Sequence, residues 1–341
     1  MDEKTVFWDT DNNCIKFVEQ TLLPAEYRII TCDSVERLSK AIKNLEVRGA
    51  PALGVAGGFG VALSAFVHDD QNMDGFLKLV LDDADFLAKT RPTAVNLSWG
   101  IRRVLNSIQD SKSPEEAREK ALLEALSIAD EDERMCRRIG ELGSALLPDK
   151  CTVLTHCNAG ALACYTWGTA LGVIRSAKDA KKDISVISCE TRPLNQGSRL
   201  TAWELSRDNI KVQTIADSAA AYLMRMGKID AVVVGADRIT HDAVFNKIGT
   251  YMHAVCAKQH NIPFYVAAPS STFDSIHSES EIVVEKRSRD ELAFCGKKQL
   301  MPESVDALNY AFDATPLELV TAIITEKGVF KPPYSKDFLT G

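Results

Sequence analysis

Two residues that can exchange protons stand at the ends of predicted strands. Cys157 closes the stretch TVLTHC and Asp237 closes AVVVGAD. A thiol beside a helix N-terminus is shifted toward thiolate, and a carboxyl group among apolar side chains keeps its proton to higher pH. The two residues are therefore candidates for acid–base chemistry. Each has a plainer interpretation, Cys157 as an inert core thiol and Asp237 as a helix cap or the ionic partner of Arg238.

A candidate phosphate site precedes the small-residue helix predicted in VRGAPALGVAGGFG. Pro51 suits the first helical turn, where exposed N–H groups, the helix dipole and the Arg48 guanidinium can meet an anion beside Gly49. Beyond Leu53, the Gly and Ala positions favour close helix packing instead. Arg91 stands before Pro92 in a similar way, although an Arg-Pro pair is commonly only a solvated helix start.

Two later segments carry polar groups near predicted helix starts. CETRPLNQGSRLTAWEL places Arg192, Asn195 and Gln196 around a glycine, an arrangement that suits a phosphate or a sugar hydroxyl. Asn246 and Lys247 are expected to begin the helix after AVVVGAD and to offer an amide and an ammonium group to an anion. No G-x-G-x-x-G or G-x-x-x-x-G-K-[ST] motif occurs, so no nucleotide cofactor is expected.

The histidines and the other cysteines give weaker signals. His156 adjoins Cys157, but strand alternation points the two side chains in opposite directions. The remaining histidines lie on polar or helical stretches and are expected at the surface, with no Ser-His-Asp set among them. Nine scattered cysteines without a C-x-x-C pair argue against a disulfide framework or a zinc site, so no metal is expected.

Hydrophobic periodicity divides the 341 residues into two predicted domains and a tail. Residues 1–147 read as a β-hairpin followed by a mostly helical domain. Residues 148–330 alternate apolar strands with amphipathic helices, which predicts an α/β, Rossmann-like parallel sheet with helices on both faces. The last predicted strand lies in PFYVAAP, and residues 331–341 form the tail.

The expected sheet also indicates where a ligand should bind. Open α/β sheets bind ligands outside the carboxyl ends of their strands. Those ends carry Cys157, Glu190-Thr191-Arg192, Asp217, Asp237-Arg238 and Ser270. One site assembled from several loops explains this set, whereas any single member can be polar simply because strand ends meet water.

Composition narrows the possible partners. Net charge is −7, with 45% hydrophobic and 26% charged residues, and there is no basic stripe to bind nucleic acid or an anionic membrane. No apolar run approaching the roughly 20 residues of a membrane span is expected. The acidic, polar N-terminus and the reduced thiols favour a cytoplasmic location.

The chain resembles the 5-methylthioribose-1-phosphate isomerases, in the family that also holds the regulatory subunits of translation initiation factor 2B. The resemblance runs in order from about Arg48 to Gly328 and is carried by VRGAPALGVA, RPTAVNLSWG, LTHCNAG, GTALGVIR, ETRPLNQGSRLTAWEL, GADRI, NKIGTY, PFYVAAPSSTFD and NYAFDATPLELVTAIITEKG. It implies an aldose–ketose isomerase of methionine salvage, acting on a sugar phosphate as a homodimer without a cofactor.

The resemblance also implies roles for individual residues. Cys157 takes the position of the catalytic thiol and Asp237 that of the proton donor. The substrate-binding positions fall on Arg48, Gly49, Ala50, Arg91, Gln196, Asn246 and Lys247.

Two departures from the family pattern concern the sugar pocket. THDAVF, between Asp237 and Asn246, is one residue shorter than usual, and CYTW replaces a more glycine-rich stretch. An isomerase of 5-deoxyribose 1-phosphate or ribose 1,5-bisphosphate therefore stays an alternative, as does a non-enzymatic regulatory subunit. The second phosphate of the bisphosphate would need a further cationic pocket, for which the sequence gives no sign.

Overall fold

The computed structural model describes residues 4–92 and 94–334. The chain forms two compact units: Met1–Arg137 with Gly160–Gly168 make unit 1, and Arg138–Ala159 with Thr169–Gly341 make unit 2. The chain thus divides inside a helix at Arg137 rather than after residue 147, and a short later segment belongs to unit 1. Most of the predicted tail, 331–341, lies outside the described residues.

Unit 1 begins with the expected hairpin and a third strand. β1 (Val6–Asp9) pairs antiparallel with β2 (Cys14–Val18), which pairs with β3 (Ile29–Cys32). Alternate residues such as Val6 and Trp8 are buried, as a half-buried strand requires. The Asp9 carboxylate closes the turn by accepting from the Asp11 N–H at 3.2 Å and the Asn12 amide at 2.8 Å.

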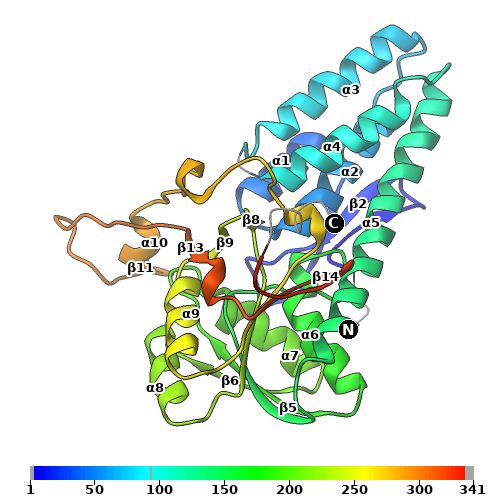
Figure 1. The fold of residues 1–341 in the computed structure, drawn as a ribbon. Helices are drawn as coiled ribbons and strands as arrows, with labels where there is room; N and C mark the ends of the chain where they lie inside the picture. Colours follow the sequence, from blue (N-terminus) through cyan, green and yellow to red (C-terminus); the bar gives the residue numbers. More distant parts are fainter. Residues whose placement is uncertain (1–3, 93, 335–341) are drawn as a thin grey trace. The chain divides into compact units, whose positions relative to one another are not determined.

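The helices of unit 1 are shown in Figure 1 in blue to green. They are α1 (Val35–Lys43), α2 (Ala50–Val67), α3 (Met73–Ala88), α4 (Val95–Ile108) and the first part of α5 (Pro114–Ser144). Apolar faces of these helices pack into one core with β1 and β2. Ser34 and Asn72 cap α1 and α3 by accepting backbone N–H groups of the first turn.

Helix α2 corrects the expectation about apolar runs. Its 18 residues are long and apolar enough to cross a membrane by length and composition. However, 78% of this stretch is buried inside the structure. A core helix passes the same test, so α2 is weak support for a membrane span.

Unit 2 contains a seven-stranded sheet in the order β15-β14-β10-β7-β4-β5-β6. The strands are β4 (Lys150–Thr155), β5 (Asp183–Cys189), β6 (Lys211–Ile215), β7 (Ala231–Val234), β10 (Phe264–Ala267), β14 (Ala322–Thr325) and β15 (Gly328–Phe330). The strands from β14 to β6 pair in parallel, and only β15 is antiparallel. The predicted fold class is confirmed, but β14 and β15 extend the sheet beyond the last predicted strand.

Helices cover both faces of this sheet (Figure 1). α8 (Ala220–Arg225) and α9 (Thr250–Gln259) share one apolar cluster with Leu154 and Val232. α6 (Ala170–Asp179) and α7 (Ala202–Arg207) share the other with Val153 and Val233. Successive residues of β4 and β7 therefore face opposite layers, as strand geometry requires.

Two smaller sheets and short helical turns complete the fold. The strands are β8 (Arg238–Ile239), β9 (Ala243–Lys247) and β13 (Phe312–Pro316) in one sheet, and β11 (Phe294–Cys295) and β12 (Lys298–Gln299) in the other. The turns are η1 (Ala161–Ala163), η2 (Gly197–Thr201, a π-helix), η3 (Asp217–Ala219), η4 (Ser270–Thr272), η5 (Glu279–Glu281) and η6 (Leu317–Leu319).

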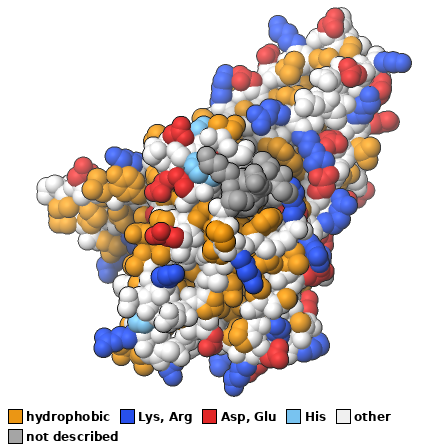
Figure 2. Space-filling view, viewed as in Figure 1, with side chains coloured by type: hydrophobic (Ala, Val, Ile, Leu, Met, Phe, Trp, Pro, Cys, Tyr) orange, Lys and Arg blue, Asp and Glu red, His pale blue; other side chains and the backbone are white. Residues whose placement is uncertain are grey.

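The segment between η5 and β13 carries α10 (Asp290–Ala293) with β11 and β12. Figure 2 shows hydrophobic side chains gathered over it at the left.

Candidate functional site

The strand order of unit 2 reverses between β4 and β7. β5 and β6 lie on one side of β4, and β7, β10 and β14 follow on the other. Cys157 follows β4 and Asp237 follows β7, so both leave the sheet at the point where doubly wound folds bind ligands. Their loops touch, because a Cβ atom at Gly235 would lie 2.6 Å from the Cβ of Ala159.

Hydrogen bonds of its backbone N–H and carbonyl groups hold Cys157 in place. It is partly exposed, has a left-handed φ of 63°, and donates its N–H to the Thr191 hydroxyl at 2.9 Å. Its carbonyl oxygen accepts from the Thr201 hydroxyl at 2.7 Å. The expected helix N-terminus is wrong: only η1 follows, within the segment that belongs to unit 1, and α6 begins at Ala170.

The loop after β5 is folded back so that Thr191 reaches Cys157. The N–H groups of Thr191 and Arg192 bond the two carboxylate oxygens of Asp217, at 2.7 and 2.8 Å. Gly197 permits the fold, because a Cβ atom there would lie only 1.7 Å from the Cys189 carbonyl oxygen. The sequence placed Thr191 and Asp217 at strand ends but gave no sign that they act on Cys157.

Gln196, in the same loop, is suited to bind a ligand. Its side chain is 7% exposed, and its Oε1 is buried without a hydrogen-bond partner among the described residues. A buried amide oxygen without a partner is unfavourable, and a sugar hydroxyl that donates to it would remove the penalty.

A buried polar network supports the carbonyl side of Cys157. Asn158 donates from its side chain to Thr201 at 3.2 Å and to Glu204 at 2.9 Å. Arg175 in turn bonds the carboxylates of Glu204 and Asp208, at 2.8 and 2.7 Å. All of these residues except Asp208 lie in segments that carry the family resemblance, but the sequence gave no sign that they form a network.

Asp237 lies in a more open setting than expected. Its side chain is exposed rather than enclosed by apolar groups, because β7 ends three residues earlier at Val234. Its N–H bonds the Phe245 carbonyl at 2.9 Å, which starts the β8–β9 hairpin. Arg238 pairs with Asp274 at 2.8 Å. The shortened THDAVF segment contains the turn of this hairpin, and Asn246 follows Phe245 on the returning strand.

The expected helix start at Asn246 and Lys247 is wrong. Both are buried at the end of β9, because β13 pairs with that strand and extends it. The Lys247 ammonium donates to the Ala311 carbonyl at 2.9 Å and lies 4.3 Å from the ring centre of Phe312.

Helix α9 begins at Thr250, and its N-terminus already has an acceptor. The Asp313 carboxylate accepts the N–H groups of Gly249 and Tyr251, at 2.7 and 3.1 Å. Burial raises the pKa of Asp313 to about 6. This helix end is thus occupied by a side chain of the protein itself.

In unit 1 the start of α2 is as expected. Gly49 precedes the helix with φ 95°, and a Cβ atom there would lie 2.4 Å from the Cα of Ala163. Arg48 donates from Nε to Gln20 at 3.0 Å, and Gln20 donates to the Leu162 carbonyl at 2.8 Å. The segment 160–168 therefore packs against the arginine–glycine pair.

Helices α2 and α4 run side by side in the same direction. Gly54 lies against Asn96 and Gly100, and the later Gly58 lies against Val104. Arg48 and Arg91 precede these two helices and hence lie at the same end of the pair. α4 begins at Val95, so Pro92 is not in its first turn and that expectation is wrong.

His156 lies with the α9 layer. Its ring nitrogens bond the Ile248 carbonyl at 2.8 Å and His253 at 3.1 Å, in agreement with the prediction that it points away from Cys157. His253 is fully buried, so its expected surface position is wrong. Polar and apolar residues are mixed along this helix, so the sequence pattern did not indicate that His253 faces the sheet.

The candidate residues thus form two groups. Unit 1 holds Arg48, Gly49, Ala50 and Arg91, and unit 2 holds Cys157, Gln196, Asp237, Asn246 and Lys247.

Comparisons with known proteins agree on one family. The initiation factor 2 subunit family matches residues 46–332. The methylthioribose-1-phosphate isomerase of Heliobacterium modesticaldum is 49% identical over 97% of this chain and 96% of its own length. The 5-methylthioribose 1-phosphate isomerase structure from Pyrococcus horikoshii matches with TM-score 0.92 and 40% identity, over 99% of this chain and 95% of that one.

A further solved structure carries a different description. The translation initiation factor eIF-2B subunit delta from A. fulgidus matches with TM-score 0.91 and 53% identity, over 98% of both chains.

Proposed function

Because the chain belongs to the initiation factor 2 subunit family, we propose that it is an aldose–ketose isomerase that converts 5-methylthioribose 1-phosphate to 5-methylthioribulose 1-phosphate in methionine salvage. The observation that carries the proposal is the thiol of Cys157 and the carboxyl of Asp237 on touching loops at the switch point of the sheet. The names of the isomerase relatives support the substrate.

The proposed chemistry needs an acid and a base. Phosphate blocks the anomeric oxygen, so the sugar ring opens only if its ring oxygen gains a proton. Asp237 in its acid form gives that proton as the bond from C1 to the ring oxygen breaks. A substrate that covers the exposed carboxyl would favour the acid form.

Cys157 is assigned the transfer between the two carbons. Its thiolate takes the proton from C2 to form an enediol-type intermediate and returns it to C1. The proton of the C2 hydroxyl passes back to Asp237 as the ketone forms, so atoms and charge balance. A direct hydride shift from C2 to C1 is the alternative, in which the same two residues orient the sugar.

We assign substrate binding to the remaining candidate positions. The Gln196 oxygen suits a sugar hydroxyl, whereas the arginine and lysine side chains and the N-terminus of α2 suit the phosphate. The set is Arg48, Gly49, Ala50, Arg91, Gln196, Asn246 and Lys247. The reaction as proposed uses neither a metal nor a nucleotide.

The test is turnover of 5-methylthioribose 1-phosphate by the purified chain, followed by NMR of the sugar. Cys157→Ser and Asp237→Asn are each expected to lose nearly all activity, while Cys256→Ser on α9 serves as the thiol control. Turnover in D2O separates the two routes, because solvent deuterium enters C1 only by proton transfer. An inactive wild-type protein would overturn the function, and active Cys157 and Asp237 variants would overturn the mechanism.

A substrate panel decides the group at C5. The methylthio, 5-deoxy and 5-phosphate sugars are compared by kcat/KM. An apolar C5 pocket separates the methylthio group from hydrogen by about 1–3 kcal/mol, or roughly 10–200-fold. A faster reaction with either alternative sugar would reassign the substrate.

The A. fulgidus structure favours one other candidate, a regulatory subunit that binds its partners without turnover. Absence of activity on the whole panel would support it. We also propose that the enzyme is cytoplasmic and a homodimer. Light scattering on the purified protein tests the dimer, and fractionation of the cells tests the location.

A further inference from the structure

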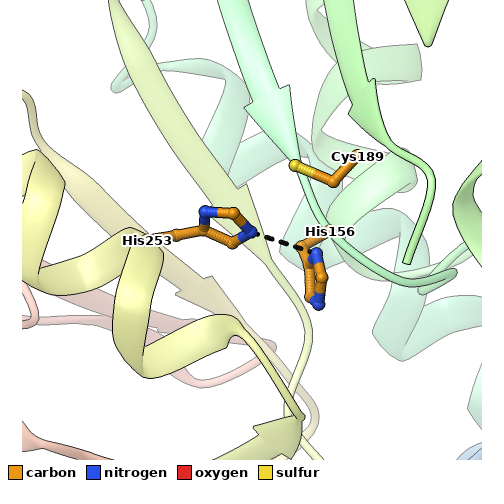
Figure 3. Close-up of side chains that lie close together, drawn as sticks. All are labelled: His156, Cys189 and His253. Carbon is orange, nitrogen blue, oxygen red and sulfur yellow. Dashed lines mark hydrogen bonds between the residues drawn. The ribbon is translucent and has the colours of Figure 1, made fainter. Parts of the chain in front are cut away.

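Three potential metal ligands lie close together beneath the loops of unit 2. They are His156, Cys189 and His253, whose side-chain ligand atoms all lie within 4.8 Å of one another. Figure 3 shows them converging from the loop directly after β4, from the end of β5 and from α9, with the two imidazole rings joined by a hydrogen bond. Each is at most 1% exposed.

The hydrogen bonds fix the protonation of both rings. The Ile248 carbonyl can only accept, so His156 carries its proton on Nε2, and its Nδ1 accepts from Nε2 of His253. Burial lowers the pKa of both histidines, that of His253 to about 3. Both rings are therefore neutral, which is the form that binds metal.

His253 has a second feature that favours a ligand. Its Nδ1 is buried and has no hydrogen-bond partner among the described residues. If its proton moves from Nε2 to Nδ1, the Nε2 lone pair is freed toward His156 and Cys189 without a change in charge. The bond from His156 Nε2 to Ile248 is the kind of second contact that orients a ligating imidazole.

We propose that His156 Nδ1, His253 Nε2 and Cys189 Sγ form a binding site for a soft divalent cation, of which Zn²⁺ is the best match. Two imidazoles and one thiolate suit zinc, and the fourth position is open to water. The two nitrogens are 3.1 Å apart, close to the spacing on a tetrahedral ion, so the sulfur needs the main adjustment. Binding releases the thiol proton of Cys189 to solvent.

The site would act on the proposed active site through Asp217. One carboxylate oxygen of Asp217 lies 3.9 Å from His156 Nδ1, and the same carboxylate holds the N–H groups of Thr191 and Arg192. A cation beside His156 attracts Asp217 and weakens its hold on that loop. Because Thr191 positions Cys157, zinc should inhibit the isomerase, a consequence that rests on the proposed function.

Metal binding is measured without substrate. The chelator-washed full chain is titrated with Co²⁺, whose bond to a thiolate gives a charge-transfer band, and with Zn²⁺ in a calorimeter. One ion per chain is expected, and Cys189→Ser and His253→Asn should lose more than the roughly 10–100-fold in affinity that loss of an outer contact costs. Cys256→Ser, a thiol change on the same helix as His253, should leave binding unchanged.

Cys157 needs its own control, since it is a partly exposed thiol. Cys157→Ser should keep the cobalt band, and loss of the band in this variant would place the metal on Cys157 and overturn the proposal. A band that survives in Cys189→Ser, or no band in the wild-type protein, would also overturn it. Circular dichroism shows that each variant is folded, and a zinc-induced rise in Tm in the wild-type protein but not in Cys189→Ser gives a second readout.

Activity is measured separately. If the chain is an isomerase, saturating Zn²⁺ should lower kcat about tenfold, a typical coupling between two sites. The effect should persist in Cys256→Ser and vanish in His253→Asn. Absence of the cobalt band from the wild-type protein would refute the metal site, whereas absent turnover with an intact band would refute the isomerase.

Discussion

The Thr191 hydroxyl accepts the backbone N–H of Cys157 at 2.9 Å, and this contact joins the loops that follow the neighbouring strands β4 and β5. Thr191 donates in turn to the Cys189 carbonyl at 3.1 Å. The hydroxyl therefore holds Cys157 in its left-handed conformation and at a fixed height above the sheet. Thr191 is a positioning residue in the proposed reaction.

Replacement of Thr191 by Val removes the hydroxyl and keeps the shape. An unsatisfied buried N–H costs about 1–3 kcal/mol, so we expect kcat to fall roughly tenfold or more with little change in KM. Thr191→Ser retains the oxygen and should restore most of kcat. Steady-state kinetics test this, and equal losses in the Val and Ser variants would contradict the role of the hydroxyl.

Glu204 is expected to matter for stability. It is fully buried and pairs with Arg175, which is 3% exposed. Glu204→Gln removes one of the two carboxylates that pair with this guanidinium among the described residues, and should lower the free energy of unfolding by about 3 kcal/mol.

The matched control is Glu141→Gln on α5. Its pair with Arg138 has the same charge types at 3.0 Å, but both side chains are more than half exposed. The expected loss is below about 1 kcal/mol. Urea unfolding of the two variants compares them, and similar losses would show that burial of the Arg175–Glu204 pair contributes little.

Gly49 should tolerate no side chain. An alanine Cβ would lie 2.4 Å from the Cα and 2.5 Å from the oxygen of Ala163, on a backbone with φ 95°. Gly227 also has a positive φ, 63°, but an added Cβ meets nothing within 4 Å. Both alanine variants carry backbone strain, and only Gly49→Ala adds overlap, which should cost about 1–3 kcal/mol more. Thermal unfolding of both variants measures the difference.

Asp132 makes the stability of unit 1 depend on pH. It is buried, accepts the Tyr165 N–H at 2.7 Å, and burial raises its pKa to about 7. Because the folded-state pKa lies above the ordinary value of 3.8, the folded protein binds the proton more tightly. This contribution to stability is complete below about pH 4 and is lost as pH rises through 7.

Urea midpoints between about pH 5 and pH 8 test this contribution. The wild-type midpoint should fall from pH 5 to about pH 7 and then level off, relative to that of Asp132→Asn, whose amide oxygen can still accept from Tyr165. Asp130→Asn, an exposed change on the same helix, should follow the wild-type profile. If the difference in urea midpoint between the wild-type protein and Asp132→Asn is constant with pH, the titration of the buried Asp132 carboxyl is contradicted.

The sequence predicted features that depend on neighbouring residues. The turn between β1 and β2 follows from Asp11, Asn12 and Asn13, which are residue types that favour turns, and the start of α2 follows from Gly49 and Pro51. The apolar runs of β4 and β7 placed Cys157 and Asp237 after strands, because a buried parallel strand is recognisable from its own composition. Each of these signals lies within a few residues of the feature that it predicts.

Only the tertiary structure decided the features that need distant partners. Asn246 and Lys247 lie in a strand because β13, more than 60 residues later, pairs with it. His253 is buried because α9 turns it toward His156 and Cys189, and Cys157 is held by Thr191 and Thr201 rather than by a following helix. Pairing and burial depend on which surfaces meet across the fold, so a local pattern fixed the type of most elements but not the contacts that give their side chains a role.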